Sequence, residues 1–190
     1  MSKITCGSKA LLFPLPTVIV GIKVDEGVNY MTVGYCGMIG GPPSTIAVAL
    51  GNQSVTYDWI EACDGFSVNI PSAKQVVETD YVGVVSGRDV DKSEVFTTFY
   101  GDLGDVPMIQ ECPVSMECRL TEILTLGDMR TCLGEIIQTH VDESCFVDDE
   151  IAISRVDPIV LSPTEAEYLR IGEVIAPAYE VSKNLMDDEA

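Results

Sequence analysis

A short polar segment carries residue types that can hold an anionic group. The segment 86–92, which reads SGRDVDK, places Ser86, Arg88 and Lys92 close together in a chain that has few cations. Arginine and lysine bind phosphate through charge-assisted hydrogen bonds, and hydroxyls with free backbone N–H groups complete such a site. This segment therefore predicts a phosphate-binding site, without identifying the ligand that carries the phosphate.

Other small polar residues lie at the ends of expected strands. Asn29 and Thr32 form one such pair, and Ser67 and Asn69 form another. Each of these residues by itself is typical of a turn or a cap. Together with the cations of segment 86–92, they are consistent with a bound cofactor that carries a phosphate, although spacing alone does not identify it.

Several catalytic classes lack their characteristic segments in this chain. No G-x-S-x-G nucleophile segment occurs, and no glycine-rich run ends in Gly-Lys-Ser/Thr. The one histidine, His140, lies in the polar phase of the expected strand 136–141. We interpret His140 as a surface residue at a strand end rather than as an acid or base.

The cysteines favour free thiols over a metal site or a disulfide framework. Their number is odd, no C-x-x-C pair occurs, and one histidine can add a single imidazole ligand. We therefore expect no metal, and buried free thiols in a reducing cytoplasm. The seven cysteines are Cys6, Cys36, Cys63, Cys112, Cys118, Cys132 and Cys145.

Length and charge limit the class of protein. The 190 residues are 46% hydrophobic and carry a net charge of −19, with a pI of about 4.1. That hydrophobic content supports one domain over residues 1–190 and excludes disorder as the main state. So acidic a surface predicts neither nucleic acid nor a membrane as a partner. The apolar stretch 10–16 is short and holds two prolines, so we expect no membrane or targeting segment and a cytoplasmic location.

Hydrophobic patterning predicts a mainly β fold with a few helices. Strands are expected over 17–24, 29–35, 45–50, 65–70, 114–126 and 132–141. The first two strands and the last two read as hairpins, and the last pair is long enough to bend around a barrel. A short helix is expected over 56–63. A second helix begins at Ala73 after the cap Ser72, with Val76, Val77 and Tyr81 facing inward.

The ordered series of motifs resembles the flavin reductase-like family, nearest to the flavoredoxins. The resemblance covers about residues 9–180, before a short acidic C-terminal tail, and segment 86–92 after VNIP is its most specific element. The matching segments are 29–32 (NYMT), 66–71 (FSVNIP), 86–92 (SGRDVDK), 111–114 (ECPV), 126–128 (LGD) and 134–136 (GEI).

This resemblance implies an FMN-binding split β-barrel with Greek-key topology that acts as a homodimer. By resemblance, the loop with Asn29, Met31 and Thr32 lies along the flavin ring, and Ser86 and Lys92 face the phosphate. Arg88 either adds its charge there or pairs with Asp89 or Asp91. The remaining implied flavin contacts are Val68, Asn69 and Ile70 as a second wall, and Tyr168 as a late aromatic residue.

The chain departs from the family pattern at several positions. Tyr35 stands where many relatives have tryptophan, and Met129 stands where relatives frequently have histidine. After strand 45–50, relatives often carry serine and arginine, whereas this chain has Ala49, Gly51 and Ser54. These changes bear on the tightness of FMN binding and on the electron donor more than on the fold.

Three functions follow from the resemblance. The first is an enzyme that oxidises NAD(P)H and reduces free flavin or another acceptor through bound FMN. The second is an FMN electron carrier that serves a protein redox partner, and the third is a split-barrel relative that has lost flavin. In the first two, the cofactor performs the chemistry, so we expect no catalytic side chain.

Overall fold

The fold is built on one antiparallel sheet of seven strands in a computed structural model that describes residues 1–25 and 27–182. The strand order is β3-β2-β6-β9-β10-β5-β4, and neighbouring strands are hydrogen-bonded. The strands are β2 (Val18–Val24), β3 (Gly27–Val33), β4 (Cys36–Gly40), β5 (Thr45–Gly51), β6 (Gly65–Ile70), β9 (Val114–Leu126) and β10 (Met129–Val141).

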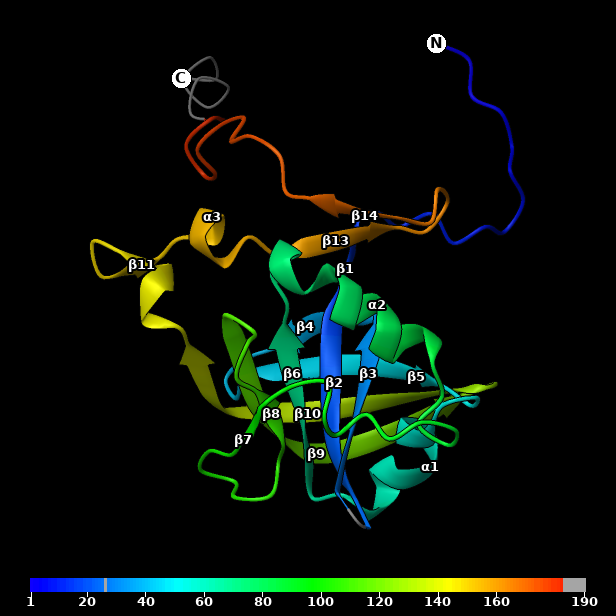
Figure 1. The fold of residues 1–190 in the computed structure, drawn as a ribbon. Helices are drawn as coiled ribbons and strands as arrows, with labels where there is room; N and C mark the ends of the chain where they lie inside the picture. The colour runs from blue at the N-terminus through cyan, green and yellow to red at the C-terminus, as the bar shows by residue number, and fades with distance from the viewer. Residues whose placement is uncertain (26, 183–190) are drawn as a thin grey trace.

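The sheet curls so that its two halves face each other. In Figure 1, β2, β3 and β6 run steeply across β5, β9 and β10. Side chains from both halves fill the space between them, and β5 alternates between buried and half-buried residues as a strand with one core face should. The main core cluster includes the fully buried Val20, Ile22, Val48, Phe66 and Val68.

Two helical segments cover the barrel on the side of β3. Helix α1 (Val55–Trp59) continues into a 3₁₀ turn (Ile60–Ala62), and helix α2 (Val76–Val84) follows a 3₁₀ turn (Ala73–Gln75). Ser72 caps that turn in a capping box with Gln75, in agreement with the predicted helix start.

The predicted inward face of α2 is wrong for Val77 and Tyr81. Thr79 and Val82 are buried, whereas Val77 is 72% exposed and Tyr81 is 41% exposed. Val82 packs in a buried cluster with Ile19 and Tyr30, and the Thr32 hydroxyl donates to the Thr79 carbonyl oxygen. The side of α2 that carries Thr79 and Val82 therefore faces the barrel.

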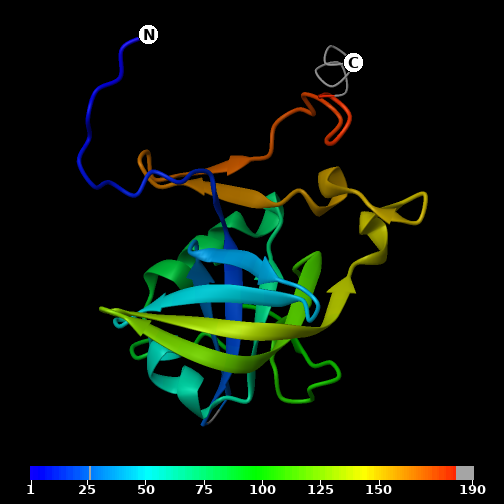
Figure 2. The same ribbon diagram turned by 180° about the vertical axis from the view of Figure 1, so that it is seen from behind.

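A smaller three-stranded sheet stands beside the barrel. It pairs β1 (Leu15–Pro16) with β13 (Ile159–Ser162) and β13 with β14 (Glu167–Arg170). Figures 1 and 2 show this sheet above the barrel, with the segments before β1 and after β14 extending from it. The remaining short elements are β7 (Thr98–Phe99), β8 (Met108–Ile109), a 3₁₀ turn (Glu143–Cys145), β11 (Phe146–Val147), β12 (Glu150–Ile151) and α3 (Ile153–Val156).

The structure confirms the mainly β fold with few helices. Among the residues described, no helix is long and apolar enough to cross a membrane. All seven cysteines are free; Cys112, Cys118, Cys132 and Cys145 are buried, Cys36 and Cys63 are half-buried, and Cys6 is exposed. The acidic C-terminal tail lies outside the described residues.

Candidate functional site

A cavity of about 460 Å³ lies where strand β3, the start of α1 and the segment after α2 meet. Its volume is within the range of small-molecule sites, which span roughly 300–1,000 Å³. Of the residues predicted to contact a cofactor, the cavity wall contains Asn29, Met31, Ser86, Arg88 and Lys92. The structure therefore brings the β3 residues and the cations of segment 86–92 to one place.

The approach of segment 86–92 to the barrel depends on a glycine. A Cβ on Gly87 would collide with the side-chain oxygen of Asn29 and press on Val55. The Asn29 amide in turn donates to the Thr56 hydroxyl at 2.9 Å. Strand β3, helix α1 and segment 86–92 are thus joined through one buried asparagine.

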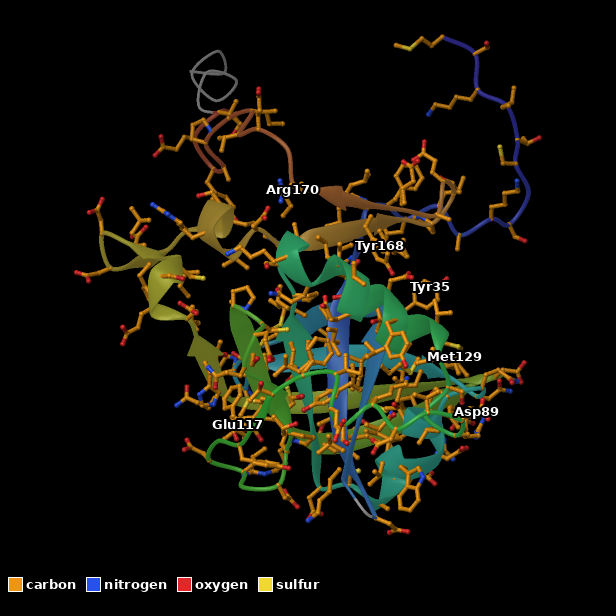
Figure 3. All side chains as sticks on the ribbon, in the orientation of Figure 1. Tyr35, Asp89, Glu117, Met129, Tyr168 and Arg170 are labelled. Carbon is orange, nitrogen blue, oxygen red and sulfur yellow. The ribbon has the colours of Figure 1, made fainter. Side chains whose placement is uncertain are left out.

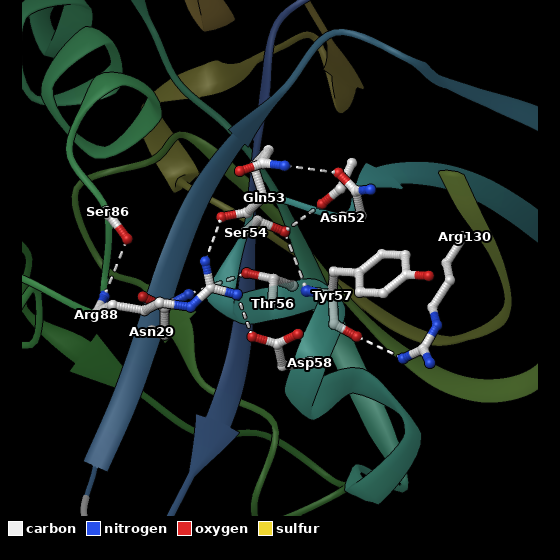
Figure 4. Close-up of polar contacts among 11 residues, drawn as sticks. Asn29, Asn52, Gln53, Ser54, Thr56, Tyr57, Asp58, Ser86, Arg88 and Arg130 are labelled. Carbon is white, nitrogen blue, oxygen red and sulfur yellow. Dashed lines mark hydrogen bonds and ion pairs between the residues drawn. The ribbon is translucent and has the colours of Figure 1, made fainter. Parts of the chain in front are cut away.

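Arg88 forms an ion pair, but with neither of the neighbouring aspartates. Its guanidinium Nη2 donates to Asp58 on α1, and Nη1 donates to the Gln53 carbonyl oxygen at 2.9 Å. Figure 4 shows these contacts together with the bond from the Arg88 backbone N–H to the Ser86 hydroxyl at 3.2 Å. The ion pair with Asp89 or Asp91 considered from the sequence is not formed, because the Arg88 guanidinium pairs with Asp58 on α1 instead.

Lys92 is far more buried than a phosphate ligand on a surface loop would be. It is 4% exposed, and its Nζ donates to the carbonyl oxygens of Tyr30 at 3.1 Å and Val82 at 2.8 Å. Burial lowers the pKa of this ammonium. An ammonium has three donors, so Lys92 ties β3 to α2 and brings positive charge to the inner wall of the cavity.

Thr32 and Tyr168 are not among the residues that line the cavity. The Thr32 hydroxyl donates a hydrogen bond to the Thr79 carbonyl oxygen on α2. The Tyr168 hydroxyl on β14 donates to Asp80 at 3.0 Å, and burial together with that carboxylate raises the pKa of Tyr168 to about 12. Thr32 thus connects α2 to the barrel, and Tyr168 connects α2 to the smaller sheet. Figure 3 labels Tyr168.

The structure does not bring the predicted second wall to this cavity. Strand β6 lies between β2 and β9, so Val68 and Asn69 are fully buried inside the sheet. The Asn69 amide donates to Ile19 and Ser67, and its oxygen accepts from Ile109, so its polar atoms serve the core. Ile70 is half-buried against a separate apolar cluster.

His140 lies near the end of β10 and is 33% exposed, in keeping with a strand-end position, but its ring is held by a buried carboxylate. Its Nε2 lies 2.9 Å from Oε1 of Glu117, whose side chain is fully buried. The ring also packs edge-on against Phe99, with centroids 5.5 Å apart. A β-bulge in β10 shifts the pairing with β9 between Ile136 and Gln138, so the regular alternation expected for this strand is interrupted before His140.

Two of the family departures face each other across the sheet. The register of β5 with β10 pairs Gly51 with Met129, and a Cβ on Gly51 would contact the Met129 sulfur at 3.8 Å. Gly51 also lines the cavity. Tyr35, the third departure, is 58% exposed just before β4.

Sequence reasoning missed the contribution of α1 to this site. Gln53, Val55 and Thr56 line the cavity, and Asp58 holds Arg88. A signal was present in Ser54, which caps α1 by accepting the Tyr57 N–H at 3.0 Å, and a capped helix start fixes where Asp58 points. The proximity of α1 to segment 86–92 was not available from the sequence.

Comparison with known proteins gives a family assignment. The family model described as "Flavin reductase like domain" matches residues 10–153. A protein of Archaeoglobus fulgidus is 30% identical over 134 residues, which are 69% of this chain and 75% of that protein.

Solved structures extend the similarity to almost the whole chain. Flavoredoxin from Methanosarcina acetivorans has a TM-score of 0.94 and 32% identity over 98% of this chain and 100% of its own. Flavoredoxin of Desulfovibrio vulgaris (Miyazaki F) has a TM-score of 0.87 and 33% identity over 95% of this chain and 100% of its own. A putative flavin reductase with a split barrel domain from Shewanella frigidimarina, 17% identical with a TM-score of 0.77 over 87% of this chain and 86% of its own, shares the fold. With a family model over most of its length, this chain belongs to the flavin reductase-like family, close to flavoredoxin, and its barrel is the split β-barrel that the motifs implied.

Proposed function

We propose that the chain is an FMN-binding redox protein of flavoredoxin or flavin reductase type. It would pass electrons from a reduced donor through the bound flavin to an acceptor. The observation that carries this proposal is the cavity beside α1, where a chain of net charge −19 collects Arg88, Lys92 and Ser86. Its similarity to two flavoredoxins supports the same function.

The residues of the cavity fit a phosphorylated flavin. Arg88 and Lys92 supply positive charge, and the Ser86 hydroxyl supplies a polar contact for a phosphate. Met31 and Val84 supply apolar surface for an aromatic ring, and the Asn29 side chain is held in place by Thr56. We infer FMN rather than FAD, because the cations of one short segment suit a single terminal phosphate.

The protein groups bind and orient the cofactor, and the flavin supplies the chemistry of accepting and donating electrons or hydride. Lys92 fixes the inner wall through its two carbonyl contacts, while Arg88 lies at an exposed edge. His140 is not among the cavity residues and is held by Glu117. No acid or base side chain from the cavity is needed for electron transfer.

The donor distinguishes an enzyme from an electron carrier. As an NAD(P)H-dependent flavin reductase, the protein would take hydride from NADH or NADPH. As a carrier, it would exchange electrons with a protein redox partner. Stopped-flow bleaching of the bound flavin separates these cases, because rapid reduction by NAD(P)H supports the enzyme and reduction only by a protein donor supports the carrier.

We also propose that the protein is a homodimer. The edge strand β4 and the segment before it expose Tyr35, Met38 and Ile39, and β14 and the residue after it expose Leu169 and Ile171. Exposed apolar surface at sheet edges is typical of an interface between chains. Light scattering after size-exclusion chromatography would report twice the mass of one chain, whereas the mass of one chain would contradict the dimer.

The function as a whole is tested by absorbance and by a flavin titration. Purified protein, or protein reconstituted with FMN, should show the visible flavin spectrum and should quench FMN fluorescence at micromolar concentrations. FMN should also raise the unfolding temperature by mass action. Neither colour nor quenching nor stabilisation in the presence of added FMN would overturn the proposal.

A further inference from the structure

The cation at the exposed edge of the cavity is already neutralised by a carboxylate. Arg88 lines the cavity, and its Nη2 donates to Asp58 on α1 (Figure 4). The two side chains are 46% and 47% exposed, so water reaches both partners. An ion pair with this exposure contributes little to stability and exchanges readily.

Both partners stand on backbone that local hydrogen bonds hold in place. Ser54 caps α1 and accepts the Tyr57 N–H, which fixes the turn that carries Asp58. The Arg88 N–H donates to the Ser86 hydroxyl, which fixes the turn that carries the guanidinium. Opening the pair therefore requires side-chain rotation rather than a change of the backbone.

A phosphate at this edge competes with Asp58 for Arg88. Guanidinium binds carboxylate and phosphate with the same pair of parallel N–H donors, and here Nη2 is used by Asp58 and Nη1 by the Gln53 carbonyl. A phosphate must displace the Asp58 carboxylate or bind beside a second negative charge. Asp89, which also lines the cavity, adds to the negative charge nearby but does not pair with Arg88 in this structure.

We propose that Asp58 is a specificity-determining residue that competes with the flavin phosphate for Arg88. The inference rests on the proposed function and deepens it. Asp58 lowers the affinity for FMN while leaving the affinity for riboflavin, which has no phosphate, unchanged. The pair thereby keeps a phosphorylated flavin exchangeable instead of permanently bound.

The test compares FMN with riboflavin by fluorescence quenching on the full chain. In Asp58→Asn, the dissociation constant for FMN should fall about tenfold, equivalent to about 1.4 kcal/mol, because Arg88 becomes available to the phosphate. The riboflavin constant should stay within about twofold, and stopped-flow dilution should show slower FMN release. Raising the salt concentration should reduce the difference between variant and wild type, since the interaction is between exposed charges.

The matched control is Glu61→Gln. Glu61 lies in the 3₁₀ turn that follows α1 and pairs with Arg130 at 3.2 Å, so its replacement removes a nearby negative charge without freeing Arg88. Its FMN-to-riboflavin ratio should stay within about twofold of wild type. Asp58→Ala serves as the second variant if Asp58→Asn folds poorly.

The outcomes separate this inference from the proposed function. Tighter FMN binding in Asp58→Asn with unchanged riboflavin binding supports competition by Asp58. An FMN-to-riboflavin ratio equal to that of wild type, or equal to that of Glu61→Gln, overturns it while FMN binding itself stands. If neither the wild type nor the variants bind either flavin, the proposed function and this inference both fail.

Discussion

Two pairs of ionisable side chains connect segments of this barrel, and they differ in how firmly they are held. Glu117 and His140 join β9 to β10 on one side, and Arg88 and Asp58 join segment 86–92 to α1 on the other. The Glu117 side chain is fully buried, whereas both members of the second pair are about half exposed. Figure 3 shows Glu117 far from Asp89, the neighbour of Arg88.

The Glu117 carboxylate has every feature of a structural group. Its oxygens accept the backbone N–H groups of Asp102 at 3.0 Å and Leu103 at 2.7 Å, besides the contact with His140. Burial raises the pKa of the Glu117 carboxyl, but the bonds from Leu103, His140 and Asp102 outweigh burial and leave that pKa below its ordinary value. A buried charge with this many partners does not exchange them for a ligand.

The difference in exposure indicates which of the two pairs can exchange its partner for a ligand. Removal of a buried, fully bonded carboxylate is strongly destabilising, because the donors that it satisfies are left without an acceptor. A half-exposed ion pair contributes little to stability, so its cation is available to an incoming anion. We therefore separate the two pairs by their effects on unfolding and on flavin binding.

The largest effect is expected from Glu117→Ala. Three donors lose their acceptor, two of them backbone N–H groups of the loop after Gly101, so the free energy of unfolding should fall by about 3 kcal/mol. Urea denaturation measures this loss. The control is Glu122→Ala on the same strand, where the side chain is exposed. Equal free energies of unfolding for Glu117→Ala and Glu122→Ala would contradict a structural role for Glu117.

Lys92→Met should have the next largest effect. The Tyr30 and Val82 carbonyl oxygens each lose a charged donor, so the free energy of unfolding should fall by about 2 kcal/mol. FMN affinity should fall as well, because the inner wall loses its charge. Lys74→Met, at an exposed position before α2, is the control. Loss of FMN binding with wild-type stability would show that Lys92 is a ligand contact and not the strut between β3 and α2.

The strands were predictable where burial imposes a clear pattern. The predicted bounds of β6 and β9 agree with the structure, because Phe66 and Val68 alternate with polar residues and β9 is long. Strands β4, β13 and β14 were missed, since each is short and lies at an edge or in the smaller sheet. Pairing with a neighbour, and not local composition, makes such segments strands.

The site was predictable as a set of residue types but not as a set of contacts. Segment 86–92 showed where the cations gather, and the cavity contains both of them. The partner of Arg88 was sought among its neighbours in sequence, whereas it comes from Asp58 through the turn between β5 and α1. In the same way, the VNIP motif marked a strand of the barrel interior, where Asn69 serves the core.

Glu117→Gln should change how stability depends on pH. The folded-state pKa of Glu117 is lowered, so its carboxylate stabilises the fold fully above about pH 4.3, the ordinary pKa of glutamate, and loses that effect as pH falls through the lower folded-state value. Glutamine does not titrate. The variant should be less stable by about 1 kcal/mol at pH 7, and the difference should shrink as pH falls below about 4. Urea denaturation of wild type and Glu117→Gln at pH 7 and below about pH 4 measures this difference in stability. A difference that does not change with pH would contradict a lowered pKa for Glu117 in the folded state.

Arg88→Ala should have the smallest effect on stability and a large effect on the ligand. Because the pair with Asp58 is half exposed, its loss should change the free energy of unfolding by about 0.5 kcal/mol or less. FMN affinity should fall about tenfold or more, since a charge-assisted contact to the phosphate is lost, while riboflavin affinity stays near that of wild type. Urea denaturation gives the free energy of unfolding, and parallel titrations with FMN and riboflavin on the same preparation give the two affinities. If Arg88→Ala destabilised the fold as strongly as Glu117→Ala, the two pairs would be equivalent struts, and Arg88 would not be the cation that a phosphate can take from Asp58.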